Sequence, residues 1–399
     1  MKCLNTLKYI LPRKRCIRQL STIPSFVTKQ SDEALCTQAV KDAEKIVGYP
    51  TSFLSLRWLL NDEVANIALH IRKLVGTNHP LLSTARDLLL SREVPAWGLI
   101  VLLISKAGGI KSPLSHLEYD VTAGILHSQR VLAEVTEMIR TSNIVHNSLL
   151  NIENKAEEEL LNLNFGNKIA LLTGDYLLSS SFRELAGLKN QEVNEIVSAT
   201  LRDLAESQFI EPRDSQNRPL PSKPLPIQED IEIANQFGTD PVPLEKVLGN
   251  CKSEWTLRHL LGGASLLAKC CQGTLRLAGH SDELQEHGYV FGRNMALAWQ
   301  ARIDAELFKD GVTGPFSLIS APVMFHLRHD PFFYDEIIKG QNGVEKVDYE
   351  YIREVVKEGP GLDETTELKK EFSDKALDVL NEFNDNEAKN ALVNMINSL

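Results

Sequence analysis

The feature that most constrains the fold is the spacing of apolar residues, which recur at steps of three and four positions along much of the chain. Over residues 56–75 this spacing places one apolar face on a helix, made of Leu56, Leu59, Leu60, Ile67, Ile71, Leu74 and Val75. Similar patterns recur over residues 126–150, 167–187, 254–280 and 283–308. No convincing run alternates as a β-strand would. The sequence therefore predicts an all-α fold built by packing helix on helix.

One segment interrupts this pattern, because its proline content is incompatible with a helix interior. Seven prolines lie between residues 211 and 244, namely Pro212, Pro219, Pro221, Pro224, Pro226, Pro241 and Pro243. The segment either divides two domains or is a loop inserted into one. The helical patterns after it continue those before it, so we expect one helical domain over residues 40–399 with a loop insertion at about 211–244.

The first 31 residues differ in charge from the rest of the chain, since they carry seven basic residues and no acidic one. Such an acid-free, Arg- and Ser-containing start predicts a mitochondrial presequence, with processing near Arg18. The alternative is a disordered basic tail that binds anionic surfaces. The rest of the chain is acidic, since the net charge of the whole is −10, and this argues against a nucleic-acid partner.

Neither a membrane span nor a disulfide framework is expected. The longest apolar run, Ala96–Ile104, is shorter than the roughly 20 residues that a spanning helix requires. The six cysteines show no Cys-x-x-Cys spacing, which fits a reducing compartment. For the neighbouring Cys270 and Cys271, helix packing is favoured over redox chemistry.

Three segments carry a resemblance to a known family. "FGNKIALLTGDYLL" at Phe165–Leu178, "FGRNMALAWQ" at Phe291–Gln300 and "EMIRTSNIVH" at Glu137–His146 resemble, in order and spacing, segments of the trans-polyprenyl diphosphate synthases. The resemblance implies an isoprenoid synthase-type helical bundle around a central cavity. It also implies a reaction in which isopentenyl diphosphate elongates an allylic diphosphate and Mg²⁺ neutralises the leaving pyrophosphate.

In this family, two Asp-Asp-x-x-Asp motifs on facing helices hold the Mg²⁺ ions. Residues at i and i+4 lie on one helical face, so their carboxylates can share a metal. In this chain the resemblance places the two motifs at positions that carry a single carboxylate, namely Asn147, Ser148 and Asn151 for the first and Ile303, Asp304 and Leu307 for the second. We therefore expect no metal, cofactor or catalytic residue on this chain.

The basic groups by which the family grips diphosphates are absent as well. The paired arginines after the first motif correspond to Ala156 and Glu157, and the Gly-Lys-x-x-Arg-Pro grip corresponds to the sequence at Glu93–Gly98. The Lys-Thr pair of the middle helix corresponds to Gly262 and Gly263. Both substrate grips are therefore lost, while the framework segments remain.

The resemblance also predicts which remaining polar residues line the cavity: His146, Lys168, Asp175 and Gln300. For His146 the alternative is a hydrogen-bonded core histidine. For Lys168 and Asp175 it is a structural pair on a helix where Gly166 and Gly174 allow close packing.

A retained framework without its reactive groups is similar to the degenerate subunits of heteromeric members of the family. The resemblance implies a non-catalytic or regulatory subunit that helps to make the ubiquinone side chain, either in the mitochondrial matrix or peripheral to the inner membrane. Its partner would be a catalytic homologue with intact motifs, in a hetero-oligomer such as a heterotetramer. Mg²⁺ would bind to the partner, and isoprenoid diphosphates would reach this chain through the complex.

Two alternatives stay open. One is an independent prenyltransferase with altered metal ligation by Asp304, Glu306, Asp175 and Asn147. The other is a helical lipid-binding or scaffold protein without a synthase partner.

Overall fold

The computed structural model describes residues 32–48, 79–90, 96–111, 121–152, 157–226, 231, 233 and 244–399. Several predicted features lie outside these residues, namely the presequence at 1–31, the helix at 56–75, the grip residues 93–95, Ala156 and most of the segment 227–243. All described residues belong to one unit of the chain, Asp32–Leu399.

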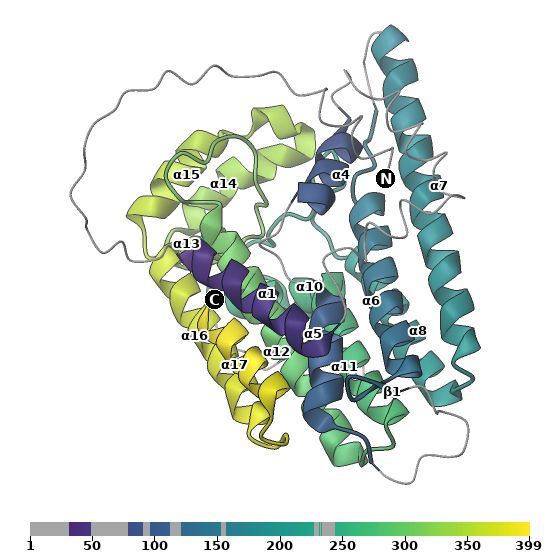
Figure 1. Ribbon diagram of the computed structural model, residues 1–399. Coiled ribbons are helices and arrows are strands. Elements are labelled where there is room, and N and C mark those ends of the chain that lie inside the picture. Colours follow the sequence, from purple (N-terminus) through teal and green to yellow (C-terminus); the bar gives the residue numbers. More distant parts are fainter. Residues whose placement is uncertain are drawn as a thin grey trace, which may run out of the picture. The chain divides into compact units, whose positions relative to one another are not determined.

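The prediction of an all-α fold is confirmed (Figure 1). The first half contains α1 (Asp32–Val47), α4 (Pro80–Leu90), α5 (Trp97–Gly108), α6 (His127–His146), α7 (Glu157–Gly187) and α8 (Gln191–Ser207). The second half contains α9 (Leu244–Val247), α10 (Cys251–His259), α11 (Ser265–Leu277), α12 (Asp282–Glu306), α13 (Ala321–His329), α14 (Tyr334–Ile337), α15 (Tyr349–Glu358), α16 (Gly361–Leu380) and α17 (Glu387–Asn397).

Shorter elements join these helices. A π-helical turn, η3 (Leu260–Ala264), connects α10 to α11, and three 3₁₀ turns follow α13 and α14: η4 (Pro331–Phe333), η5 (Ile338–Asn342) and η6 (Val344–Lys346). A two-residue hairpin precedes α6, in which β1 (Val121–Thr122) pairs antiparallel with β2 (Ile125–Leu126).

The core is centred on α12, which packs against α11 and α16. Phe291, Met295 and Leu297 of α12 are fully buried. A Cβ atom at Gly292 would lie 2.8 Å from both the Cα of Ala268 and the carbonyl oxygen of Leu267, closer than van der Waals contact allows. The glycine of "FGRN" therefore lets α12 approach the backbone of α11.

Cys270 and Cys271 lie in this core with their thiols free. Both side chains are fully buried, and burial raises the pKa of Cys270 to about 12. A thiol that stays protonated at neutral pH is a poor nucleophile. The pair therefore serves packing.

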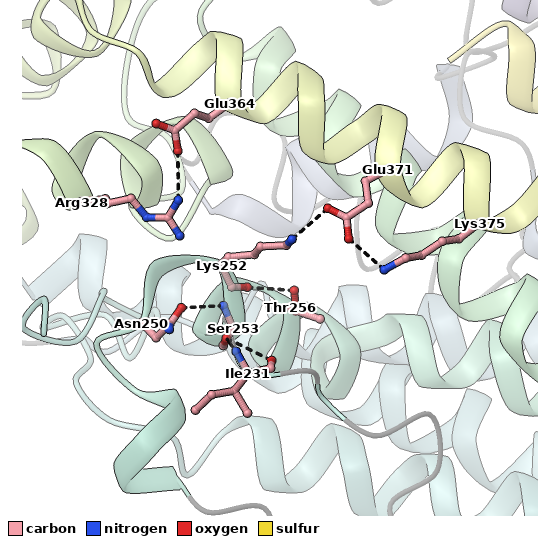
Figure 2. A network of polar contacts seen from close by, with 9 residues as sticks. All are labelled: Ile231, Asn250, Lys252, Ser253, Thr256, Arg328, Glu364, Glu371 and Lys375. Atoms are coloured by element: carbon pink, nitrogen blue, oxygen red, sulfur yellow. Dashed lines mark hydrogen bonds and ion pairs between the residues drawn. The ribbon is translucent and has the colours of Figure 1, made fainter. Parts of the chain in front are cut away.

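Several helices begin at a residue whose side chain accepts a hydrogen bond from the first turn. Asn190 does so for α8, Asn250 for α10, Asp348 for α15 and Asn386 for α17. Each cap satisfies a backbone N–H that the helix leaves without a partner. In α10, Ser253 also exchanges hydrogen bonds with the backbone of residue 231 and so attaches that segment to the helix (Figure 2).

Charged side chains connect α16 to its neighbours (Figure 2). The Glu371 carboxylate accepts hydrogen bonds from Lys252 of α10 and Lys375 of α16, each at 2.8 Å. Arg328 of α13 lies 3.5 Å from Glu364 of α16. The Lys252 contact holds α16 against α10, the helix that leads into the π turn, and the Arg328 contact holds α16 against α13.

On another side of the core, α7 runs alongside α6 (Figure 1). The glycines of "FGNKIALLTGD" make room for two histidine rings. A Cβ atom at Gly174 would lie 2.1 Å from His146 Nε2, and one at Gly166 would lie 2.3 Å from His79 Cδ2. Any larger residue at these positions would require the two rings or the helix to move.

None of the helices in the described part of the chain combines the length and apolarity needed to cross a membrane.

Candidate functional site

The second half of α6, α8, the π turn η3 and α12 surround a cavity of about 1080 Å³. Its apolar wall includes Leu178, Leu201, Leu204, Leu266, Trp299 and Ile303. The π turn contributes Gly262 and Gly263, where the family carries a Lys-Thr pair. A Cβ atom at Gly262 would meet no other atom within 4 Å, so the glycines leave this part of the cavity open.

The first motif lies at the end of a helix and not within it. α6 ends at His146, and Asn147 is its C-terminal capping residue. Asn147 and Asn151 line the cavity, whereas Ser148 is buried and its hydroxyl donates to the carbonyl of Val145 at 2.6 Å. These positions therefore do not share one helical face as the aspartates of the family's motif do, because α6 ends before the motif begins.

Asn151 attaches a distant turn to the cavity rim. Its Nδ2 donates to the carbonyl of Ser215 at 3.0 Å. Its backbone N–H donates to Gln216 Oε1 at 3.1 Å, and Gln216 Nε2 donates back to its carbonyl at 3.1 Å. The third position of the motif thus has a structural role, in which amide groups replace the expected carboxylate.

The second motif lies within α12, and its three side chains differ in environment. Ile303 lines the cavity. Asp304 is 1% exposed and is not part of the cavity wall. Leu307 caps the C-terminus of α12, and its carbonyl accepts from Arg353 at 3.5 Å.

Both oxygens of Asp304 are used by the protein itself. Oδ2 accepts from Trp255 Nε1 and from the backbone N–H of Ala321, each at 2.8 Å. Oδ1 accepts from Gln300 Nε2 at 2.7 Å. The carboxylate therefore joins α10, α12 and the start of α13.

His259 adds a second titratable group beside Asp304. Its Nε2 lies 3.9 Å from Asp304 Oδ2 and has no hydrogen-bond partner among the described residues. Burial lowers the pKa of His259. Burial also raises the pKa of Asp304, although His259 and the hydrogen bonds from Trp255, Ala321 and Gln300 oppose that rise. Both shifts disfavour the charged forms.

These residues do not fit the Mg²⁺ site that the fold family implies. Mg²⁺ requires several oxygen ligands in octahedral geometry, and the six motif positions offer only one carboxylate, whose oxygens are engaged. The other acids considered for altered ligation have partners of their own: Glu306 accepts from Arg302 at 3.0 Å, and Asp175 lies 3.3 Å from His146 Nε2. Among the described residues, no three His, Cys, Asp or Glu side chains are grouped as metal ligands.

The four residues predicted to line the cavity lie in two places. His146 and Gln300 are in its wall. Lys168 and Asp175 are exposed on α7 and are not in the wall. Lys168 and Asp175 were expected to line the cavity, and the structure places them elsewhere. The face of α7 that carries Ile169 and Leu178 packs on the protein, so Lys168 and Asp175 lie on the outer face.

Sequence reasoning missed the arginines of the cavity wall. Arg140, Arg213, Arg218 and Arg258 all line it, and Arg140 lies over the ring of Trp97 at 4.9 Å. Two of them belong to "EPRDSQNRP" in the Pro-rich segment. The spacing of these two matches no known motif, so only the hydrogen bonds that hold their turn beside Asn151 identify them as cavity residues.

Sequence comparison agrees with this architecture. Residues 98–223 match the family described as Polyprenyl synthetase. The human "All trans-polyprenyl-diphosphate synthase PDSS2" is 38% identical over 94% of this chain and 90% of its own length. The "Probable hexaprenyl pyrophosphate synthase, mitochondrial" of Neurospora crassa is 28% identical over 90% of this chain and 83% of its own length.

Solved structures share the fold. A polyprenyl synthase from Caulobacter crescentus, complexed with calcium and isoprenyl diphosphate, superposes with a TM-score of 0.59 at 16% identity, covering 90% of this chain and 96% of that one. A decaprenyl diphosphate synthase from Rhodobacter capsulatus superposes with a TM-score of 0.55 at 15% identity, covering 92% and 98%. Together with the human relative's identity over nearly the whole chain, these matches show that the protein belongs to the trans-polyprenyl diphosphate synthase family.

Proposed function

We propose that this chain is a non-catalytic subunit of a heteromeric trans-polyprenyl diphosphate synthase. The observation that carries the proposal is the state of the two metal-binding motifs. Asn147 and Asn151 face the cavity without negative charge, and Asp304 is buried in hydrogen bonds to its own protein. A chain that cannot hold the metals of this reaction needs a homologue that can.

The partner we propose is therefore a second family member with intact Asp-Asp-x-x-Asp motifs. It would bind Mg²⁺ and carry out the elongation of an allylic diphosphate by isopentenyl diphosphate. This chain would stabilise the partner, since a protein that binds only the folded form shifts the folding equilibrium towards it. We propose a heterotetramer, as two copies of each chain would allow every catalytic subunit to contact a supporting one.

We further propose that the complex works in mitochondria on the ubiquinone side chain. The basic, acid-free segment at residues 1–31 and fungal relatives whose names include "mitochondrial" support this location. A single helical domain over residues 40–399, with the Pro-rich segment at 211–244 as an insertion, remains part of the proposal.

The test is an activity measurement on three samples: this chain alone, the homologous catalytic chain alone, and the two coexpressed. Each receives labelled isopentenyl diphosphate, farnesyl diphosphate and Mg²⁺. We expect product to rise at least tenfold when both chains are present, and none from this chain alone.

A pair of matched variants locates the metal. Asp304→Asn in this chain should leave the activity of the complex within about twofold, because asparagine has the same shape and Gln300 can rotate its amide to accept from the new N–H group. The same change at the first aspartate of the partner's motif should abolish it. Turnover by this chain alone, abolished by Asp304→Asn, would instead establish an independent prenyltransferase with altered ligation.

A further inference from the structure

A short hairpin forms one side of the cavity wall. Its residues 213–219, here called the strap, all line the cavity except Ser215. The backbone N–H of Asp214 donates to the carbonyl of Arg218 at 2.8 Å. Asp214 Oδ1 in turn accepts from the backbone N–H groups of Gln216 and Arg218, each at 2.8 Å. The strap therefore keeps its shape through bonds within itself.

The base of the strap is anchored in the protein. Arg213 is 9% exposed, and its guanidinium donates to the carbonyl of Ser207 at the end of α8 at 2.5 Å. Leu220, which follows the strap, is fully buried. The carbonyl of Glu211, two residues before the strap, accepts from Arg258 of α10 at 2.9 Å. The base cannot move without breaking these contacts.

The tip of the strap is held in a different way, because its bonds join two distant segments and are uncharged. On one side, Ser215 and Gln216 make the three bonds with Asn151 described above, all of them exposed to solvent. On the other side, the backbone N–H of Ser215 donates to the carbonyl of Gly340 in η5 at 3.0 Å. Water competes for exposed hydrogen bonds, so the tip can open locally while the base stays in place.

The side chain of Asn151 suits this contact, and an aspartate there would not. Its Nδ2 donates to the carbonyl of Ser215 at 3.0 Å. An ionised carboxylate has no hydrogen to donate, and its oxygen would repel that carbonyl. Asn147 also lines the cavity, but its side chain makes no hydrogen bond with any described residue. Of these two asparagines, only Asn151 is coupled to the strap.

We propose that the strap opens and closes over the cavity as a local unit, and that the amide pair of Asn151 and Gln216 is its latch. In the closed state the tip joins the segment after α6 to η5. In the open state these tip bonds are broken, while Arg213 and Leu220 keep the base buried.

The latch gives the third position of the first motif a conformational role. Where the family carries a metal-binding aspartate, this chain carries an amide that fastens a strap across the cavity wall. The inference goes beyond the proposed subunit role, because it requires neither a partner nor turnover.

The test is hydrogen exchange of the purified full-length chain, followed by mass spectrometry. We expect the peptide that contains Ser215 to exchange faster than peptides of the buried helix α12. Asn151→Asp and, separately, Gln216→Ala should each accelerate exchange in the Ser215 peptide at least tenfold and leave α12 unchanged. Trp97 and Trp299 line the cavity, so quenching of tryptophan fluorescence by acrylamide should also rise in both variants.

A control and a rescue make the assignment specific. Asn147→Asp introduces the same charge four residues away in the same cavity wall, and it should leave exchange in the Ser215 peptide unchanged. Gln216→Lys added to Asn151→Asp should restore slow exchange to within about threefold of the unchanged chain, because the ammonium group can pair with the new carboxylate.

Three outcomes would overturn the proposal. Unchanged exchange in both Asn151→Asp and Gln216→Ala would show that the amide pair is not the latch. Equal acceleration by Asn147→Asp would show that any added charge in the wall has this effect. Exchange of the Ser215 peptide as slow as that of α12 would show that the strap opens only when the whole domain unfolds. None of these results touches the subunit proposal, which is tested by turnover of the complex.

Discussion

At the residue scale, the environment of Asp304 decides what this carboxylate does. A metal ligand in this fold has to face the cavity, whereas Asp304 lies behind the wall and accepts three hydrogen bonds. Removing it would leave Trp255 Nε1 and the backbone N–H of Ala321 buried without acceptors. Each such loss costs about 1–3 kcal/mol.

We therefore predict that Asp304→Ala lowers the free energy of unfolding by about 3 kcal/mol, whereas Asp304→Asn lowers it by about 1 kcal/mol or less. An asparagine can place its oxygen where Oδ2 accepts from Trp255 and Ala321, and its Nδ2 can donate to Gln300 after that amide rotates. Urea unfolding with and without Mg²⁺ measures both. A stabilisation by Mg²⁺ that only the original aspartate shows would contradict the structural role.

At the element scale, α7 is the helix whose exposed face needs a partner. It packs against α6, yet Leu161 and Leu172 on its outer side are 69% and 53% exposed. Lys168 and Asp175 lie on the same exposed side. Exposed apolar residues separated by about three helical turns, with charged residues on the same side of the helix, are typical of a surface that another helical protein covers. The occupant we propose is the homologous catalytic subunit.

We predict that Leu161→Asp combined with Leu172→Asp prevents co-elution of the two subunits in size-exclusion chromatography and reduces their joint activity at least tenfold. Buried against a partner, each aspartate would place a charge at an apolar contact and lose its hydration there. Phe332→Asp is the control, because Phe332 is 86% exposed on the short turn η4. Loss of co-elution in the control as well would mean that the effect is not specific to α7.

At the scale of the whole molecule, several buried histidines couple folding to pH. Burial lowers the pKa values of His79, His259 and His326 below the ordinary value of 6.5. A group whose pKa is lower in the folded state contributes stability above its unfolded pKa, and this stability is lost as the pH falls towards the folded value. Asp304 acts in the opposite direction, since its pKa is raised.

We predict that the melting temperature falls by several degrees between pH 7.5 and pH 5.5, because unfolding allows three histidines to take up protons. Calorimetry at a series of pH values measures the trend. His326→Gln should flatten it, since both ring nitrogens of His326 lack partners among the described residues. A melting temperature that stays constant or rises on acidification would refute this coupling.

The sequence by itself determined the class of fold and the family. The three- and four-residue apolar spacing requires amphipathic helices whatever their partners are, and α6, α7, α11 and α12 lie where that spacing predicts them. The segments "FGNKIALLTGDYLL" and "FGRNMALAWQ" indicated the correct family. Their glycines let α7 pack closely on two histidine rings and α12 on the backbone of α11, which larger residues would hinder. The missing carboxylates at Asn147, Ser148 and Asn151 could also be identified from sequence alone.

Only the tertiary structure decided which side chains meet. The packing of helices that are distant in sequence buries Asp304 behind the cavity wall and leaves Lys168 and Asp175 facing outwards. It also decides that α6 ends at His146. The same holds for Arg213 and Arg218, which a turn far along the chain brings to the cavity through Asn151. Local spacing determines which side chains share one face of a helix. The burial and the counter-charge of each polar side chain come from non-local contacts, and these two properties decide its chemical role.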